Sequence, residues 1–137
     1  MLMAGLFLLA AAPQAAPCAI SVEAAADGSF AQAGYQVSSA HLARVAAATR
    51  RRFAAAAGRL CAAGVLRPGD LARFRRLVVQ NGEGATEPLI YRTRGMPPRT
   101  WIFQYAFQDG GPPPVAEFER ALRCWKRPRA DGCEIGD

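Results

Sequence analysis

The sequence predicts an α+β fold in which a long amphipathic helix packs on a small antiparallel sheet of about three to four strands, with a further helix at the C-terminal end. Three patterns in the 137-residue chain carry this prediction. Apolar residues recur at helical spacing over residues 40–63 and again over 114–126, and aromatic residues alternate over 99–108. A helix and a sheet that are each apolar on one side bury those sides against each other.

The chain begins with an apolar run, Ala4 to Ala12, that is too short to cross a bilayer as a helix. Pro13 ends the run and small residues follow, which is the layout of a secretory signal peptide, although no Lys or Arg precedes the run. We therefore expect residues 1–16 to be a signal peptide. Residues 17–137 are expected to form a single exported domain, periplasmic or secreted, with no transmembrane segment in the mature protein.

The segment before the long helix is expected to contain one strand and one loop. Residues 18–23, CAISVE, predict a first strand with Ile20 and Val22 on one face. Residues 24–34 are rich in small residues and contain an Asp-Gly pair, which favours a loop with a turn.

Residues 40–63 have the clearest helical pattern. Ser38 or Ser39 can accept a hydrogen bond from the free N–H groups at the start of the helix, and Gly64 favours its end. The apolar residues fall within a narrow arc at 100° per residue. This stripe consists of Leu42, Val45, Thr49, Phe53, Ala56 and Leu60.

The middle of the chain is expected to hold a short helical turn and two strands. Asp70 can cap a turn that continues through Leu71 and Phe74. Residues 75–80, RRLVVQ, predict one strand, the NGEG sequence that follows predicts a turn, and residues 87–93 predict another strand.

The aromatic run predicts the strand that forms the core of the sheet. Trp101, Phe103, Tyr105 and Phe107 share one face at period two. Such a ladder can stack bases or sugars, but a long helix is available to cover it, which favours a core role. The last helix has a stripe of its own, made of Val115, Phe118, Leu122 and Trp125.

This order of elements resembles the cystatin-like architecture in outline. The likeness rests on the order of strands and helices and not on residues. It therefore implies only an antiparallel meander packed against a helix. No protease-inhibitor signature accompanies it.

The four cysteines allow three pairings. Cys124 lies on the solvent side of the last helix, and the Pro128 break and the following Ala-Asp-Gly turn can bring Cys133 back to it. Cys18 and Cys61 would then form the other disulfide. The sequence favours this pairing, which suits an oxidising compartment.

Metal and redox chemistry find little support at these cysteines. No two of them are closer than nine positions, so neither the paired ligands of structural zinc nor a CxxC redox motif is present. The Asp-Gly-Cys-Glu sequence that ends near Glu134 is similar to the end of the Excalibur-type calcium-binding motif. It lacks the alternating aspartates of that motif and supplies few oxygen ligands. We expect no cofactor.

Arginine is concentrated in one part of the chain. The formal net charge is +6, and residues 44–76 contain nine arginines and one acidic residue, Asp70. An arginine-biased composition alone explains such a solvated helix face, but guanidinium groups also bind carboxylates and phosphates. The candidate anion-binding residues are Arg44, Arg50, Arg51, Arg52, Arg59, Arg73, Arg75 and Arg76.

The leading hypothesis is therefore a small exported envelope protein of bacteria with a binding or structural role, which contacts an anionic envelope component or an acidic protein. Nucleic acid is disfavoured because export removes that partner. The first alternative is a secreted inhibitor or chaperone-like module that binds protein through the loops at residues 81–87 and 94–99. The second alternative is a small hydrolase.

A catalytic role has few candidate residues. His41 is the single histidine and lies in the first turn of the predicted helix, near Arg44. Glu83, Glu87 and Asp109 lie in or near predicted turns without a spacing that indicates a carboxylate pair. We therefore expect that the protein is not an enzyme.

Overall fold

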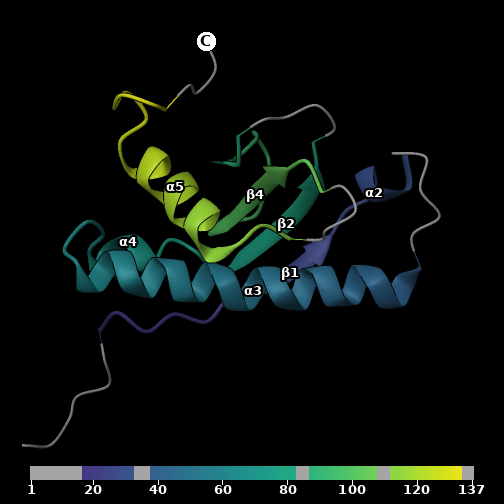
Figure 1. Cartoon of the computed structure of the whole chain (residues 1–137), viewed down its shortest axis with the longest axis horizontal. Helices are drawn as coiled ribbons and strands as arrows, with labels where there is room; N and C mark the ends of the chain where they lie inside the picture. The colour runs from purple at the N-terminus through teal and green to yellow at the C-terminus, as the bar shows by residue number, and fades with distance from the viewer. Residues whose placement is uncertain (1–16, 33–37, 83–86, 108–111, 134–137) are drawn as a thin grey trace, which may run out of the picture.

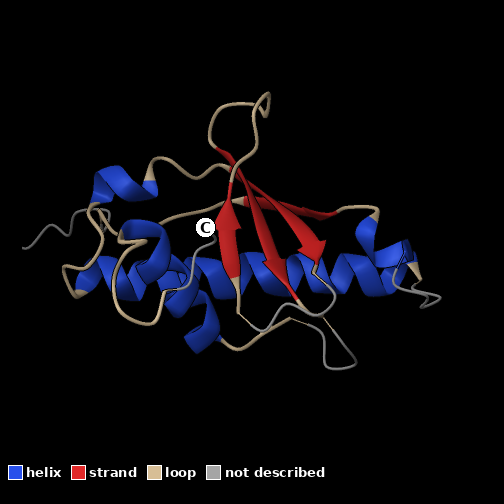
Figure 2. Ribbon diagram, turned by 90° about the horizontal axis from the view of Figure 1, so that it is seen from above, coloured by secondary structure: helices blue, strands red, loops and turns tan. Residues whose placement is uncertain are grey.

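The computed structural model describes residues 17–32, 38–82, 87–107 and 112–133. A four-strand sheet lies above a long helix, and the C-terminal helix crosses beside it on the same side of the sheet (Figures 1 and 2). This confirms the predicted packing of a long helix on a small sheet with a further helix near the C-terminus. The elements in chain order are β1 (Glu23–Ala26), α2 (Ser29–Gln32), α3 (Ser39–Ala62), α4 (Pro68–Leu71), β2 (Arg76–Asn81), β3 (Leu89–Tyr91), β4 (Thr100–Tyr105) and α5 (Val115–Lys126).

The sheet is mixed, so the antiparallel arrangement expected from the sequence is wrong. Its strand order is β1-β2-β4-β3, with β1, β2 and β4 parallel and only β3 antiparallel to its neighbour β4. The helix α3 connects β1 to β2 and returns the chain to the same end of the sheet, which makes these two strands parallel. The cystatin-like meander is therefore not the topology of this chain.

The strand order follows from burial. The first four residues of β4 are all buried, and this strand takes a central position in the sheet, where its Phe103 stacks on Phe118 of α5. The short β3 takes the edge, so β2 and β3 are not neighbours even though a turn sequence separates them. Leu77 and Val79 of β2 and Phe103 of β4 are fully buried on the core face of the two central strands.

The predicted long helix is confirmed nearly residue for residue. Ser38 caps its start, with its Oγ accepting from the His41 N–H at 3.1 Å. Gly64 ends it with φ +81°, a conformation that favours glycine. The Gly64 N–H donates to the Cys61 carbonyl and the Val65 N–H to the Leu60 carbonyl, which satisfies the last turn.

Two local predictions need correction. The first strand begins at Glu23, the last residue of the predicted segment 18–23, and β1 and α2 together occupy part of the predicted loop. Ala24 and Ala26 pack against the core, and such small side chains give a weak strand pattern in the sequence. Asp70 does not occupy the N-cap position of α4; its Oδ2 accepts from the N–H of the cap residue Arg67 at 2.8 Å.

Aromatic rings join the layers, as the core interpretation of β4 predicts. Phe103 of β4 stacks on Phe118 of α5 with ring centroids 4.6 Å apart. Phe74, from the connection between α4 and β2, contacts the rings of Phe53, Trp101 and Trp125 at 4.7–5.2 Å. These rings belong to α3, β4 and α5, so one cluster holds both helices to the sheet.

Two disulfides connect the same pairs that the sequence favours. Cys18 joins Cys61 and ties the N-terminal segment to the last turns of α3. Cys124 joins Cys133 and fastens residues 127–133 to α5. Of the helices that the structure describes, none is long and apolar enough to cross a membrane.

The two disulfides are expected to differ in their contribution to stability. Cys18 and Cys61 are 43 positions apart, and Cys124 and Cys133 are nine apart, so the first bond closes the larger loop in the unfolded chain. The loop-closure entropy predicts a loss of about 4 kcal/mol for the Cys18→Ala/Cys61→Ala variant and about 3 kcal/mol for Cys124→Ala/Cys133→Ala. Guanidinium unfolding of both variants measures these losses, and a larger loss for the second pair would contradict the expectation.

Candidate anion-binding surface

The candidate arginines of α3 separate into two groups. Arg44, Arg50 and Arg51 are exposed, and within the described residues no hydrogen bond or ion pair involves their side chains. Arg44 and Arg51 lie opposite the buried residues Val45 and Thr49, while Arg50 lies on a flank of the helix. These three arginines therefore do not face one common direction.

The other two arginines of α3 hold α5 in place. The Arg52 Nη1 donates to the carbonyls of Pro112 and Pro113, at 2.8 and 2.9 Å, just before α5 begins. Arg59 forms an ion pair with Glu119 of α5 at 3.1 Å. Both side chains lie on the flank of α3 that faces α5, so their charges take part in packing between the two helices.

The candidate arginines after α4 lie where β2 begins. Arg73, Arg75 and Arg76 are all exposed. The N–H groups of Arg75 and Arg76 donate to the Arg99 carbonyl at 2.8 and 3.2 Å, and the Arg99 Nε donates to the Ala72 carbonyl at 2.8 Å. These bonds place the segment 72–76 beside the loop that leads into β4.

Trp101 connects the two segments through its ring. The indole N–H donates to the Arg73 carbonyl at 2.8 Å. The guanidinium carbons of Arg73 and Arg92 each lie 5.5 Å from the centre of the Trp101 ring, a cation–π distance. Arg73 also lies 4.8 Å from the ring of Trp125. Two arginines are therefore held at the edge of the aromatic core.

The loop between β3 and β4 is ordered by its own arginines. Arg92 Nη1 donates to the carbonyls of Pro97 and Thr100, and Nη2 donates to that of Met96. Arg99 has φ +61°, which is uncommon for a residue with a side chain and persists where neighbouring contacts hold it. The hydrogen bonds to segment 72–76 supply such contacts.

The result is one basic surface at the end of the sheet where β2 and β4 begin. We name it the arginine surface; it comprises Arg73, Arg75, Arg76, Arg92, Arg94 and Arg99, all exposed. Neither segment 72–76 nor segment 92–99 contains an acidic residue. Glu23 lies beside Arg76 in the parallel register and offsets part of the charge.

Sequence reasoning included three of these six residues and missed Arg92, Arg94 and Arg99. Residues 77–137 have balanced charges overall, which concealed a local excess. A local excess of positive charge is visible in the sequence, because residues 92–99, RTRGMPPR, contain three arginines and no acidic residue. Only the pairing of β2 with β4 shows that this stretch lies beside Arg75 and Arg76.

The candidate catalytic residues do not converge in the described part of the chain. Glu87 forms ion pairs with Arg120, which also pairs with Glu117. His41 lies in the first turn of α3, and Glu83 and Asp109 lie outside the described residues. Among the described His, Cys, Asp and Glu residues, no group could hold a metal ion.

A polar cluster on the outer face of the sheet is internally hydrogen-bonded. The Tyr91 hydroxyl and the Gln104 amide both donate to the Gln80 Oε1, at 2.8 and 2.7 Å, and the Gln80 amide donates to Asp27 at 3.3 Å. Burial raises the pKa of Tyr91, and the negative charge of Asp27 adds to this shift, against the opposing effect of the hydrogen bond to Gln80. These side chains satisfy one another, which indicates a structural role.

Asp70 fixes the segment that carries Arg73 against α5. Both of its carboxylate oxygens accept hydrogen bonds from Lys126 Nζ, at 3.0 and 2.8 Å. Desolvation alone would raise the pKa of Asp70. The hydrogen bonds from Lys126 and the Arg67 N–H, together with the charges of Lys126 and Arg73, outweigh it and hold the pKa below its usual value.

We expect Asp70→Asn to destabilise the protein in a pH-dependent way. Because the folded-state pKa is lowered, the ionised carboxylate contributes stability above its unfolded pKa of 3.8 and loses that contribution as the pH falls further. At pH 7 the free energy of unfolding of the variant should be about 1 kcal/mol lower than that of the unchanged protein. This difference should shrink from about pH 4 downward. Urea unfolding from pH 7 to pH 3 measures it, with Asp131→Asn as an exposed control; a difference independent of pH would contradict the expectation.

Comparisons with protein-family models, with curated proteins and with solved structures found no match to this chain. No relative therefore suggests a ligand or an activity. The chemistry of the described side chains, above all the arginine surface, is what supports a functional proposal.

Proposed function

We propose that this chain is a small exported protein with a binding or structural role in the bacterial cell envelope, where it contacts an anionic component through the arginine surface. The observation that carries the proposal is the meeting of six exposed arginines from two separate segments at one end of the sheet. Guanidinium groups form charge-assisted hydrogen bonds with phosphates and carboxylates. Clustered positive charge also attracts anionic partners at a distance.

The arginine surface is partly preorganised for binding. Arg73 and Arg92 are held against Trp101, and Arg99 is held by its bond to Ala72. Less conformational entropy is then lost when these groups meet a partner. Arg75, Arg76 and Arg94 have no side-chain hydrogen bonds within the described residues, so their donors are available to phosphate or carboxylate oxygens.

The end of the sheet is a better candidate than α3 alone. Two of the five candidate arginines of α3, Arg52 and Arg59, are engaged by α5. Of the three exposed arginines, Arg44 and Arg51 lie on one side of α3, and Arg50 points about 100° away from Arg51, so all three do not face one flat partner. The exposed arginines of α3 therefore supply at most a second, smaller contact.

The proposed location outside the cytoplasm rests on two features. Residues 1–16, which lie outside the described residues, have the composition of a signal peptide. The two disulfides suit an oxidising compartment. The role proposed is binding rather than catalysis, since Glu87, a candidate catalytic carboxylate, is engaged by Arg120.

Vesicle binding tests the proposal. The non-reduced protein is expected to co-sediment with phosphatidylglycerol vesicles at low salt, to release as ionic strength rises, and to bind neutral phosphatidylcholine vesicles weakly. At about 1 kcal/mol for each arginine near the surface, Arg75→Gln/Arg76→Gln/Arg94→Gln should weaken binding about 100-fold.

The matched control removes the same charge from α3. The variant Arg44→Gln/Arg50→Gln/Arg51→Gln should weaken binding far less than the triple variant at the sheet end. If the α3 variant weakens binding as much or more, the long helix or the overall charge is responsible and the arginine surface is not. Binding that neither variant changes would exclude both surfaces.

A protein-binding module is the second candidate. Most of its first predicted loop, residues 81–87, lies outside the described residues, but the second, at residues 94–99, is held in place within the described loop 92–99. Arg92 donates hydrogen bonds to the carbonyls of Met96 and Pro97 in this loop and to that of Thr100 at the start of β4, and Pro97 and Pro98 are exposed. Rigid exposed loops suit recognition of a protein surface. A partner from a periplasmic extract that stays bound at high salt, and is lost on changing Pro97 and Pro98 to Gly, would favour this function over anion binding.

A further inference from the structure

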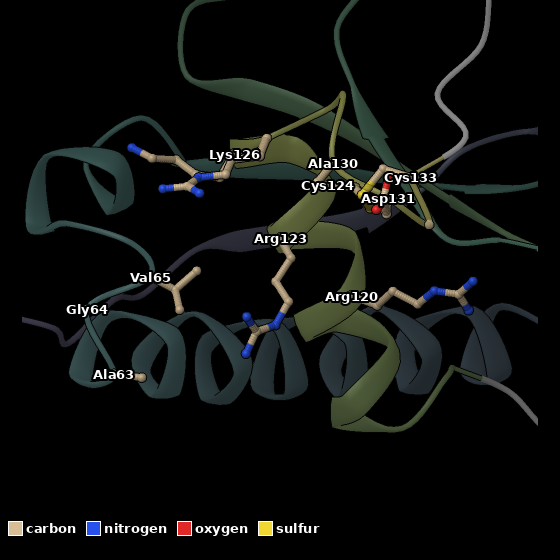
Figure 3. Close-up of a pocket in the computed structure, with 12 residues that line it drawn as sticks. Ala63, Gly64, Val65, Arg120, Arg123, Cys124, Lys126, Ala130, Asp131 and Cys133 are labelled. Atoms are coloured by element: carbon tan, nitrogen blue, oxygen red, sulfur yellow. A yellow bond between two sulfur atoms is a disulfide. The ribbon is translucent and has the colours of Figure 1, made fainter.

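A groove lies between the C-terminal ends of the two long helices, apart from the arginine surface. One wall is formed by Ala63, Gly64 and Val65, which directly follow α3, and the other by the second half of α5 and the segment 127–133 (Figure 3). Its volume is about 540 Å³. Small-molecule sites commonly have volumes of roughly 300–1,000 Å³, so the groove has the size of a ligand site.

The charged residues of the groove are mostly basic. Arg120, Arg123, Lys126 and Arg127 line it, against Asp131 as the acidic residue. Lys126 is engaged by Asp70, and Arg120 by Glu87 and Glu117. Arg123 and Arg127 are exposed, and no ion pair involves them within the part of the chain that the structure describes.

The side chains of the groove are arranged around one of these arginines. In Figure 3, Arg123 extends from α5 toward α3 on the side of Val65, and the disulfide of Cys124 and Cys133 lies nearer the C-terminal end of α5. Arg120 points away along α3. The apolar surface comes from Val65, Ala130 and the disulfide, so a guanidinium group lies beside apolar walls.

Basic residues in the last turn of a helix interact favourably with the negative end of the helix dipole. This interaction accounts in part for Arg123 and Lys126 in the last turn of α5. The dipole does not account for the concave surface, in which the segment after α5 is fastened back on the helix by a disulfide. Residues 127–133 have no regular secondary structure, and the disulfide joins the end of this segment back to Cys124 of α5. The disulfide therefore maintains the shape of the groove.

We propose that this groove binds a small amphipathic anion, a carboxylate or a phosphate monoester with a short apolar group. Arg123 and Arg127 bind the anionic head, and Val65, Ala130 and the disulfide contact the apolar part. Guanidinium groups bind both heads through paired hydrogen bonds, and the cavity volume admits a ligand of this size. The site is distinct from the arginine surface, because none of the six arginines of that surface lines it.

NMR titration of the non-reduced, ¹⁵N-labelled protein tests the proposal. The probes are octanoate and octyl phosphate, with octanol as the neutral analogue and acetate and inorganic phosphate as the heads alone. Octanoate, octyl phosphate or both should shift the amide signals of Gly64, Val65 and Gly132. Binding of one probe alone identifies the preferred head. Octanol and the isolated heads should bind at least about tenfold more weakly, since octanol lacks the anionic head and acetate and inorganic phosphate lack the apolar chain.

Two kinds of variant locate the site. Arg123→Gln/Arg127→Gln should weaken binding of the preferred probe about tenfold or more. Ala130→Trp should block it without a change of charge, and Ala130 is exposed, so the replacement need not disturb the core. Arg75→Gln/Arg76→Gln is the matched control and should bind the probe as the unchanged protein does.

Three results would overturn the groove proposal. Octanol could shift the amide signals as strongly as the anionic probes do, or Arg123→Gln/Arg127→Gln could leave binding of the probe unchanged. The probe could also shift only the amide signals of segments 72–76 and 92–99. These results concern a small soluble ligand. The proposed role of the arginine surface is measured separately by vesicle binding, so either proposal can fail while the other stands.

Discussion

The aromatic cluster around Phe74 is the contact on which the rest of the structure depends. Phe74 is 2% exposed and comes from the irregular connection between α4 and β2. Its ring meets Phe53 of α3, Trp101 of β4 and Trp125 of α5. Because interiors are closely packed, a ring shared by three elements fixes the long helix, the central strand and the C-terminal helix relative to one another. The fully buried Phe103–Phe118 stack extends this packing along β4.

The same cluster determines where the charged groups lie. The guanidinium group of Arg73 lies over the rings of Trp101 and Trp125, and that of Arg92 lies over the ring of Trp101. This contact gathers arginines from two segments at one end of the sheet. On α5, the inward position of Trp125 leaves Cys124 and Arg123 on the outer side of the helix, where they form a wall of the groove. The packing of Trp101 and Trp125 therefore influences the position of both candidate binding surfaces.

Sequence patterns predicted the elements whose signal is local and strong. The helix α3 shows its apolar stripe over 24 residues, and Ser38 and Gly64 mark its ends through hydrogen-bonding and backbone preferences. The alternation in β4 and the phase that places Cys124 outward are likewise properties of a few turns or pleats. In contrast, β1 consists of Glu23 and three alanines; Ala24 and Ala26 pack against the core, but such small side chains give no clear alternation.

What the sequence by itself determined was the long helix, the aromatic core strand, the C-terminal helix, the favoured cysteine pairing and the abundance of arginine. Only the tertiary structure decided that β2 and β4 are parallel neighbours, that Arg52 and Arg59 pack α5 against α3, and that Arg92, Arg94 and Arg99 join the arginines that precede β2. The reason is physical. Periodicity reports which face of one element is apolar, whereas strand order depends on how all apolar faces are buried together, and that depends on contacts between residues far apart in the chain.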